Sequence, residues 1–469
     1  MSTPNTHFGA AEIARMLADV KQIYFLGVGG SHMSSLAHIT HVRGYGVGGY
    51  DRSPSALTRR LSEEGIPIRY TLEPEQLEGY GAVVYTVAIA PDNPLYVKAE
   101  KMGIPRISRA DYLGYVMEAY ENRVGISGMH GKSTCTSMCA HTFLAAGANP
   151  TVLSGAEMEE MGGAYHVGGE EHFLFEACEY MDSFLDFYPT VAVIRNSEMD
   201  HPDYFTSLEQ IRTSYAAFAA KTGPEGCAIA NFDDANVRAA LEYYNGELIT
   251  FGVTNKSADY TAENVRYVGG KPEFDILFRG SFLCHVALAV PGAHNVLNSL
   301  ACAAAAHRCG IAPEAIGQGL STFRGAKRRM EFKGRLNGAD VFDDYGHHPT
   351  EVKATLEGLS RMAYDRVWCV FQPHTYSRTA ELFEDFVTAF DSADRILFAD
   401  IYTARGDEVN PTQVSSELLS NRIGEKADYY GDLADIAAEL RENVYDGDAV
   451  VVMGAGDIYR LYDLLPLEN

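Results

Sequence analysis

The residues best suited to chemistry form one loop, Gly128-Met129-His130-Gly131-Lys132-Ser133-Thr134. An apolar strand pattern, Arg123–Ser127, enters this loop and a helical pattern leaves it. Glycines allow the backbone to wrap a phosphate, and a helix N-terminus directs N–H groups at the anion. Lys132 would neutralise terminal phosphates, and the Ser133 hydroxyl would bind Mg²⁺. Because Ile126 occupies the first position of the usual GxxxxGK[ST] spacing, a glycine turn with a surface lysine is the competing interpretation.

Two acids and a histidine follow neighbouring strand patterns. Glu176 ends the apolar run Phe173–Glu176, and Asp200-His201 comes a few residues after the run Val191–Ile194. The carboxyl ends of parallel strands open into one crevice, so these groups would face the phosphate loop. Carboxylate and imidazole groups there could hold the Mg²⁺ of ATP. Taken singly, a capping acid and a surface histidine are the simpler explanation.

A second glycine loop, Gly27-Val28-Gly29-Gly30-Ser31-His32-Met33, follows the strand pattern Gln22–Leu26. Asp51 closes the next strand, about where a ribose-binding acid lies in dinucleotide-binding folds. His32 stands where GxGxxG has its third glycine. The loop therefore suits a nucleotide diphosphate without saying which one, and a tight turn explains it equally well. An NAD-dependent dehydrogenase is a further alternative, but it leaves the Gly-Lys-Ser loop unexplained.

Other polar segments occupy positions where substrates bind. Asn295 and Asn298 are three residues apart on one helical face, where they could read an adenine edge or cap the helix. The basic run Lys327-Arg328-Arg329 is a solvated face or a clamp on phosphates. Asp343–Glu351 and Gln372–Arg378 each follow a strand pattern, at the end where substrate groups lie.

Composition restricts the class of protein. Acidic residues outnumber basic ones 63 to 38, for a net charge of −25, which excludes a basic footprint for nucleic acid. The 8 cysteines contain no CxxC pair and suit free thiols in a reducing cytoplasm. The sequence shows no signal-peptide pattern and no apolar stretch of about 18 residues, so we expect a cytoplasmic chain without a membrane span.

Strand and helix patterns alternate along the 469 residues, which predicts three α/β domains with parallel sheets. The polar break at Glu118–Asn122 and a second one near Phe323–Lys327 divide the chain into residues 1–120, 121–325 and 326–469. Further strands are predicted at Gly46–Tyr50, Ala82–Thr86, Ile104–Ile107, Asp340–Phe342, Val367–Phe371, Arg395–Ala399 and Ala449–Met453. A helix over Pro54–Glu64, capped by Ser53, and another over Leu300–Cys309 are also expected.

Taken together and in this order, the motifs resemble those of the Mur ligase family, from about Lys21 to Leu464. The similarity is greatest to the alanine-adding branch of that family. The segments that carry it are Gly128–Thr134, Glu176–Tyr180 with Asp200-His201, Gly292–Asn298, Asp343–Glu351 and Gln372–Arg378. Their joint occurrence outweighs the simpler explanations that each segment allows alone.

The resemblance implies a Rossmann-like N-terminal domain that binds a UDP-sugar, a central P-loop ATPase-like domain, and a C-terminal Rossmann-like domain that brings the amino acid. It also implies ATP-dependent ligation of L-alanine to the lactyl carboxylate of UDP-N-acetylmuramate through an acyl phosphate, in peptidoglycan precursor synthesis. The alternatives are a ligase for glycine, serine or a recycled murein peptide, and a non-catalytic nucleotide-binding homologue. A monomer or a homodimer is expected.

The resemblance also assigns roles residue by residue. The implied metal ligands are Ser133, Glu176 and His201. The implied catalytic groups are Lys132, Glu176, His201, His347, His374 and Arg378, of which Arg378 would pair with the carboxylate of the amino acid. The implied ATP contacts are Gly128, Met129, His130, Gly131, Lys132, Ser133, Thr134, Asn295, Asn298, Asp344 and either Arg328 or Arg329. The implied UDP-sugar contacts are Gly27, Gly29, Gly30, His32, Met33 and Asp51.

Some positions depart from the family pattern. His32 and Ser35 replace glycines of the first loop, so either crowding of the diphosphate or a contact from His32 is expected. Arg195-Asn196 stands where the family has Thr-Asn, and Met129 replaces a threonine. Residues 202–220 contain no lysine, so the carbamylated lysine of sister ligases is expected to be missing.

Overall fold

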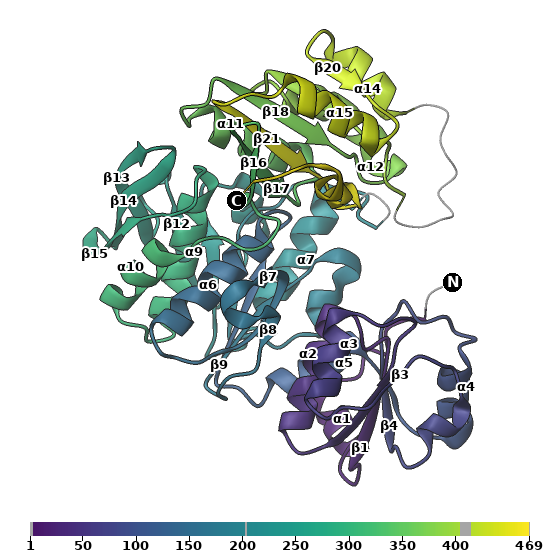
Figure 1. The fold of residues 1–469 in the computed structure, drawn as a ribbon. Coiled ribbons are helices and arrows are strands. Elements are labelled where there is room, and N and C mark those ends of the chain that lie inside the picture. Colours follow the sequence, from purple (N-terminus) through teal and green to yellow (C-terminus); the bar gives the residue numbers. More distant parts are fainter. Residues whose placement is uncertain (1–2, 202–203, 404–413, 469) are drawn as a thin grey trace.

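A computed structural model describes residues 3–201, 204–403 and 414–468. Its strands form three sheets that follow one another along the chain (Figure 1). The N-terminal part lies at the bottom of that view, the middle part in the centre, and the C-terminal part at the top. The predicted α/β class with parallel sheets is confirmed. Within the described residues, none of the helices combines the length and the apolar character that crossing a membrane requires.

The N-terminal sheet has the order β3-β2-β1-β4-β5, and all its strands are parallel. The strands are β1 (Gln22–Leu26), β2 (Gly46–Tyr50), β3 (Ile68–Arg69), β4 (Ala82–Tyr85) and β5 (Arg106–Ser108). The helices are α1 (Ala10–Met16), α2 (Ser31–Val42), α3 (Ala56–Glu63), α4 (Pro94–Met102) and α5 (Arg109–Met117), with a 3₁₀ turn at Pro74–Leu77. The four predicted strands are present, each within two residues of the predicted ends.

The predicted start of helix α3 was wrong. The helix begins at Ala56 rather than at Pro54, because Ser55 and not Ser53 is the capping residue. The Ser55 hydroxyl accepts a hydrogen bond from the Thr58 N–H at 3.2 Å, and the Thr58 hydroxyl accepts one from the Ser55 N–H at 2.8 Å. This reciprocal pair satisfies two N–H groups at once, which a single serine before the proline would not do.

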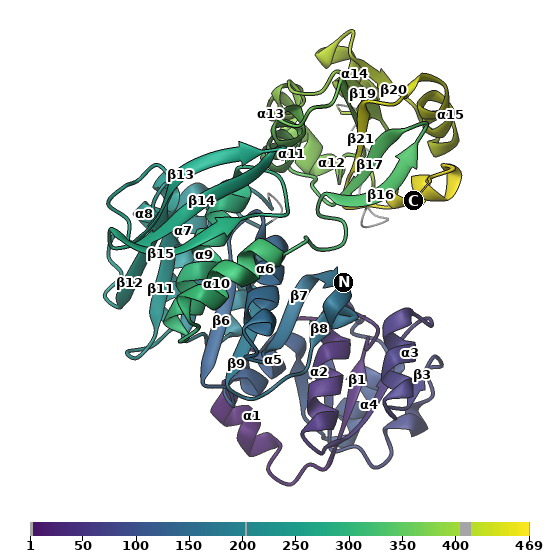
Figure 2. The same ribbon diagram turned by 60° about the vertical axis from the view of Figure 1, so that its left-hand side comes forward.

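The middle sheet has ten strands in the order β15-β14-β13-β12-β11-β10-β6-β9-β7-β8. They are β6 (Asn122–Ser127), β7 (Thr151–Met158), β8 (Gly163–His166), β9 (His172–Glu176), β10 (Val191–Ile194), β11 (Cys227–Asn231), β12 (Glu247–Gly252), β13 (Tyr260–Val268), β14 (Lys271–Phe278) and β15 (Ser281–Ala287). The centre is parallel, whereas β8, β14 and β15 pair with their neighbours in antiparallel fashion. Figure 2 shows the antiparallel strands β13, β14 and β15 at the edge of this part, an extension that the alternating pattern did not predict.

The helices of the middle part are α6 (Lys132–Ala145), α7 (Leu208–Ala220), α8 (Ala235–Ala240), α9 (His294–Arg308) and α10 (Pro313–Thr322), with 3₁₀ turns at Glu159–Met161 and Tyr180–Asp186. Helix α9 packs against α6 and α10. Its alanines Ala301 and Ala303 to Ala306 are completely buried. Small side chains let helices approach closely, which explains the alanine-rich sequence of α9 without any functional role.

The C-terminal sheet has the order β16-β17-β21-β18-β19-β20, and among its described strands the β16–β17 pair is antiparallel and the other pairs are parallel. The strands are β16 (Glu331–Leu336), β17 (Ala339–Asp344), β18 (Arg366–Phe371), β19 (Arg395–Phe398), β20 (Ala427–Tyr429) and β21 (Asp448–Met453). The helices are α11 (Pro349–Ser360), α12 (Tyr376–Glu381), α13 (Phe383–Ala389), α14 (Ser416–Ile423) and α15 (Leu433–Asn443), followed by a 3₁₀ segment at Ile458–Leu464.

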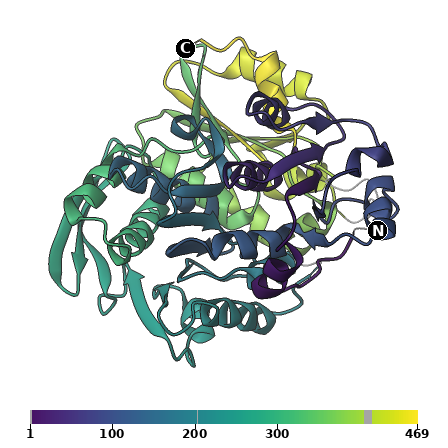
Figure 3. The same cartoon turned by 90° about the horizontal axis from the view of Figure 1, so that it is seen from below.

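The N-terminal part packs firmly on the middle part. Ile13, Leu113 and Phe184 belong to one continuous apolar cluster that spans both parts. Gly114 of α5 lies so close to the Asp186 carbonyl that a Cβ there would be 2.2 Å from its oxygen. In Figure 3, seen from below, the purple N-terminal helices lie in front of the middle elements. The first glycine loop is thereby held in a fixed place relative to the middle sheet.

Candidate active site

The phosphate loop joins β6 to α6, and side chains that follow β10 hold it from outside. Gly128 and Gly131 have φ angles of 139° and 70°, which L side chains rarely adopt. Asn196 accepts from the His130 N–H at 2.9 Å and donates to the His130 carbonyl at 3.0 Å. Helix α6 begins at Lys132, so its free N–H groups lie at the loop. The predicted strand, loop and helix are therefore present in that order.

The ammonium of Lys132 is bound to a buried acid. Its Nζ donates to the Gly128 carbonyl at 2.7 Å and lies 3.0 Å from each carboxylate oxygen of Glu179. Burial alone would raise the pKa of Glu179, but Lys132 and His201 outweigh it and lower the pKa. Sequence reasoning assigned no role to Glu179, although a second acid three residues after the strand end was a visible signal.

The predicted metal ligands lie beside the loop. The Ser133 hydroxyl donates to Glu176 Oε2 at 2.9 Å, and the Gly155 N–H donates to the same oxygen at 2.8 Å. His201 Nε2 lies 3.4 Å from Glu179 Oε1, and the cavity that Ser133 and Glu176 line is also lined by His201. A hydroxyl and a carboxylate in contact form an oxygen donor set that suits Mg²⁺. The residues present therefore fit such an ion.

Two cavities meet at the loop. One, of about 540 Å³, extends to Asn295 and Asp344, and the other, of about 470 Å³, extends to Lys132 and Arg378. Both are lined by His130, Gly131, Arg329 and Glu351. The first has the size and mixed lining of a small-molecule site. Lys132, Ser133 and Glu176 line the second cavity alone, so one elongated ligand could place its phosphates there and its other end in the first cavity.

The two asparagines occupy different places in helix α9. Asn295 lines the first cavity, whereas Asn298 is completely buried behind it. Asn298 Nδ2 donates to Asn295 Oδ1 at 2.8 Å, and its Oδ1 accepts from Arg195. Asn298 thus contributes to the cavity through Asn295 rather than by facing it.

The two arginines of the basic run lie in different places. Arg329 Nη2 donates to the Ser133 hydroxyl at 3.2 Å, and Arg329 lines both cavities. Arg328 instead pairs with Asp343 at 3.4 Å and donates to the Gly454 carbonyl at 2.7 Å. The geometry therefore favours Arg329 as the residue near phosphate and gives Arg328 a structural position.

Asp344 is buried at the edge of the first cavity. Its carboxylate accepts from the Met330 N–H at 3.0 Å and from the Gly346 N–H at 2.7 Å. Burial raises the pKa of Asp344 to about 6, although Arg329 acts in the opposite direction. Asp344 thus lies on the edge of the C-terminal part that lines the first cavity, and its contact with ATP stays a prediction.

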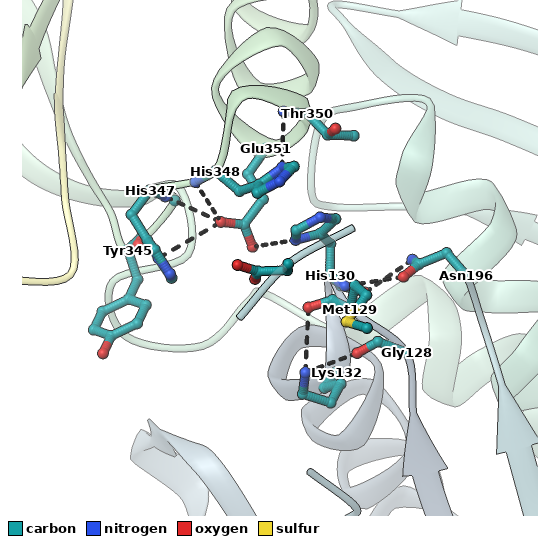
Figure 4. A network of polar contacts seen from close by, with 12 residues as sticks. Gly128, Met129, His130, Lys132, Asn196, Tyr345, His347, His348, Thr350 and Glu351 are labelled. Atoms are coloured by element: carbon teal, nitrogen blue, oxygen red, sulfur yellow. Dashed lines mark hydrogen bonds and ion pairs between the residues drawn. The ribbon is translucent and has the colours of Figure 1, made fainter. Parts of the chain in front are cut away.

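His130 links the loop to the C-terminal part. Its Nε2 lies 2.6 Å from Glu198 Oε1 in the middle part, and its Nδ1 lies 3.6 Å from Glu351 Oε1 in α11 (Figure 4). The other oxygen of Glu351 accepts from the His347 and His348 N–H groups at 3.0 and 3.3 Å. Burial alone would lower the pKa of His130, but the two carboxylates outweigh it and raise the pKa to about 10.

The predicted amino-acid side of the site is assembled from two loops. The rings of His347 and His374 lie 5.4 Å apart, and burial lowers their pKa values to about 3 and about 4. Arg378 donates to Asp200 Oδ1 at 2.9 and 3.0 Å, and its Nη1 lies 3.2 Å from His374 Nδ1. Arg378 is thus near the predicted place, but an acid of the middle part already holds one edge of its guanidinium.

Asp51 shapes the first glycine loop, and two basic side chains, His32 and Arg109, lie together. Gly29 donates its N–H to Asp51 Oδ2 at 2.7 Å, and a Cβ at Gly29 would meet that oxygen at the same distance. His32 Nδ1 lies 3.2 Å from Arg109 Nη1, and burial lowers the pKa of His32 to about 3. Met33 is buried in the core, so its side chain does not face the loop. Sequence reasoning missed Arg109.

The other predicted residues lie where expected along the two loops. Gly27 has a φ of 81° and donates its N–H to the Tyr50 carbonyl at 2.8 Å, and Gly30 ends the turn as the cap of α2. Met129 and Thr134 line the second and the first cavity, respectively. Asn298 and Arg328 line neither of the two cavities, and the side chain of Met33 is buried in the core.

Fold and site together define a class of protein, a three-part α/β enzyme whose central sheet carries a phosphate loop. Three family descriptions match the sequence: "Mur ligase family, catalytic domain" over residues 22–121, "Mur ligase middle domain" over 126–306, and "Mur ligase, glutamate ligase domain" over 328–456. The chain belongs to the Mur ligase family.

Similar proteins extend over nearly the whole chain. A UDP-N-acetylmuramate–L-alanine ligase of Alkaliphilus metalliredigens is 40% identical, over 96% of this chain and 98% of the relative. One of Caldanaerobacter subterraneus is 41% identical, over 97% and 99%. The crystal structure of a UDP-N-acetylmuramate–alanine ligase from Thermotoga maritima matches with a TM-score of 0.77 and 25% identity, over 94% of this chain and 98% of that one.

Proposed function

We propose that the chain joins L-alanine to the lactyl carboxylate of UDP-N-acetylmuramate and converts ATP to ADP and phosphate. The relatives that match over nearly the full length support this substrate pair. The observation that carries the proposal is the second cavity, where the phosphate-loop residues Lys132 and Ser133 face His347, His374 and Arg378 of the C-terminal part. One site thus combines groups for phosphate with groups for an acceptor.

The proposed reaction has two steps. A lactyl carboxylate oxygen attacks the γ-phosphorus of ATP, the bond to the β-phosphate oxygen breaks, and ADP leaves. The amine of L-alanine then attacks the acyl carbon, a proton is lost from nitrogen, and phosphate leaves as the amide forms. A carboxylate approaching a triphosphate brings anions together, so the cations of Lys132 and Arg329 offset their repulsion. Mg²⁺ held by Ser133 and Glu176, with His201 nearby, would supply further positive charge.

We assign the substrates to the three parts as follows. Residues 1–120 bind the UDP-sugar at the first glycine loop, where Arg109 and His32 lie together. Residues 121–325 bind ATP in the cavities that meet at the phosphate loop. Residues 326–469 bring the amino acid, with Arg378 beside its carboxylate. Free thiols at all eight cysteines and the need for ATP favour the cytoplasm.

The decisive experiment is phosphate release by the purified full chain. ATP, UDP-N-acetylmuramate and L-alanine together should release phosphate, and omission of either acceptor substrate should reduce release to background. Glycine, L-serine and a murein tripeptide at matched concentration test the acceptor. Faster turnover with the tripeptide would replace the proposal by a recycling ligase, and no release with any acceptor would contradict ligase activity. Size-exclusion chromatography with light scattering distinguishes a monomer from a homodimer, the two states that are expected.

A further inference from the structure

Arg195 is a buried cation beside the nucleotide cavity. It directly follows β10, its exposed fraction is 6%, and it lines the 540 Å³ cavity. Within residues 3–201, 204–403 and 414–468, no carboxylate forms an ion pair with it. Its Nε–H is buried without a hydrogen-bond partner in the same residues. Burial lowers the pKa of this guanidinium. A buried charge without a counter-charge is costly, so its position calls for a function.

Two hydrogen bonds of the guanidinium differ in whether another side chain duplicates them. Nη1 donates to the His130 carbonyl in the phosphate loop, and Nη2 donates to Asn298 Oδ1 in helix α9. Asn196 already donates to the same His130 carbonyl at 3.0 Å and accepts from the His130 N–H at 2.9 Å. The loop therefore stays held without Arg195. The contact with Asn298 is the one that no other side chain duplicates among the contacts described.

This contact imposes a direction on two amide groups. A guanidinium can only donate, so Asn298 must turn Oδ1 toward Arg195 and Nδ2 toward Asn295. Asn295 must then accept with Oδ1, at 2.8 Å, and its own Nδ2 donates to the Pro291 carbonyl at 2.7 Å. An amide NH₂ has two hydrogens, and Asn295 lines the cavity. One N–H of Asn295 is left for a ligand.

We propose that Arg195 is a positioning residue that, through Asn298, fixes the amide of Asn295 so that it offers an N–H to an acceptor atom of the nucleobase. Without the guanidinium, the Asn298 amide can rotate and turn Oδ1 toward Asn295 Oδ1, and among the contacts described the Pro291 carbonyl alone would then orient Asn295. The inference rests on the proposed function in one respect, namely that the cavity binds the base of ATP. It adds a determinant of base recognition that contacts no substrate itself.

The first test distinguishes an effect on binding of the base from an effect on binding of the phosphates. The affinity of the full chain for ADP and for inorganic tripolyphosphate, a probe without a base, is measured by calorimetry for the wild type and for Arg195→Met. The variant should bind ADP about tenfold more weakly, the size expected for one lost hydrogen bond to an oriented group, and tripolyphosphate within about twofold. The control is Arg308→Met, which removes an exposed arginine of the same part and should change neither affinity.

The second test keeps the fold and removes the hydrogen-bond donor that Asn298 offers to Asn295. Asn298→Asp offers Arg195 a carboxylate, so it removes the unpaired charge, but an oxygen-only group cannot donate to Asn295. This variant should melt no lower than the wild type and still bind ADP about tenfold more weakly. In a double-mutant cycle, Arg195→Met added to Asn298→Asp should cause little further loss, because both act through Asn295.

The outcomes divide clearly. Wild-type ADP affinity in Asn298→Asp would overturn the proposal, and so would an equal loss of ADP and tripolyphosphate affinity in Arg195→Met, which would place the effect in the phosphate loop. Should Arg195→Met not fold, Asn298→Asp alone decides. A wild-type chain that binds ADP but shows no alanine-dependent phosphate release would contradict the proposed function and leave this inference standing.

Discussion

Lys132 and Glu179 are joined by two contacts of 3.0 Å between the ammonium of the phosphate loop and a completely buried carboxylate. The acid follows β9 by three residues and also lies 3.4 Å from His201 Nε2. One carboxylate thus organises two groups that the proposed reaction uses. In this arrangement the positive charge of the lysine is balanced by the protein, so a triphosphate would compete with Glu179 for the ammonium.

Replacement of Lys132 by alanine should abolish useful turnover. The ammonium offsets the repulsion between a carboxylate and the γ-phosphate, and removal of one such group from an active site costs about 10²–10³ in rate. Phosphate release with all three substrates measures the effect, with circular dichroism to verify the fold. Arg308→Ala serves as a control that removes a distant cation. Activity close to that of the wild type in Lys132→Ala would refute the assignment of the phosphate loop.

Replacement of Glu179 by glutamine should destabilise the protein, because it leaves Lys132 buried without its counter-charge. Breaking a buried pair in this way costs about 3–5 kcal/mol. The pKa of Glu179 is lowered in the folded state, so its stabilising contribution is present above the unfolded pKa of about 4.3 and is lost as the pH falls through the folded value.

Urea unfolding at pH 7 and at pH 3.5 checks both statements about Glu179→Gln. The difference in unfolding free energy between wild type and variant should be large at pH 7 and smaller at pH 3.5. Equal stability of the two proteins at pH 7 would show that Lys132 finds another partner when the carboxylate is gone.

Much of the fold could be predicted from local patterns. The strands β1, β2 and β10 have the predicted bounds, because short apolar runs between turn residues identify buried parallel strands. The rule that parallel strands open their carboxyl ends to one crevice also explains why the predicted residues Ser133, Glu176 and His201 line one cavity. The antiparallel strands β13 to β15 contain many exposed residues instead of one continuous buried run, and the sequence patterns did not predict them.

The remaining features depend on contacts between distant segments. Glu179 gains its role from Lys132, 47 residues earlier, and Arg109 from His32, 77 residues earlier. Asn298, buried behind Asn295, accepts a hydrogen bond from Arg195, which follows strand β10 and lies 103 residues earlier in the sequence. No spacing rule within one segment reveals such pairs. Sequence patterns therefore located the site, while the partners of its charged groups came from the packing of the sheets.

Metal removal should stop the reaction. Ser133 and Glu176 form an oxygen donor set at 2.9 Å, so chelation with EDTA should abolish phosphate release, and added Mg²⁺ should restore it. Glu176→Gln keeps the hydrogen bond to the Gly155 N–H but loses the charge, and it should raise the Mg²⁺ concentration for half-maximal activity about tenfold or more. Ser154→Ala is a nearby control whose hydroxyl is buried away from the cavities. An unchanged Mg²⁺ requirement in Glu176→Gln would remove Glu176 from the ligand set.

The pH dependence of stability should reveal the imidazolium of His130. Its pKa is raised to about 10 in the folded protein, so the contribution to stability is complete below the unfolded value of about 6.5 and is lost as the pH rises through about 10. His130→Asn removes the charge between Glu198 and Glu351. The unfolding free-energy difference between wild type and variant should therefore shrink steadily from pH 6.5 to pH 10. A difference that stays constant over this range would mean that His130 is not charged in the folded state.

The last prediction concerns the acceptor. Arg378 binds Asp200 through Nε and Nη2, and its Nη1 lies near His374, so the edge that carries Nη1 is the one open to a substrate carboxylate. Arg378→Lys keeps a positive charge but cannot make both contacts in parallel. The KM for L-alanine should rise about tenfold or more. The KM for ATP should stay within about twofold, because the phosphate-loop residues and not Arg378 would bind ATP.

Asp200→Asn provides the matched control for this experiment. It weakens the hold on Arg378 without removing the guanidinium, and it should raise the KM for L-alanine less than Arg378→Lys does. Steady-state phosphate release at varied L-alanine and varied ATP gives both constants. Since loss of folded protein would lower the apparent kcat without changing either KM, a rise confined to the KM for L-alanine identifies Arg378 as the acceptor-binding residue. An equal change in both KM values would assign Arg378 to the contact between the middle and C-terminal parts.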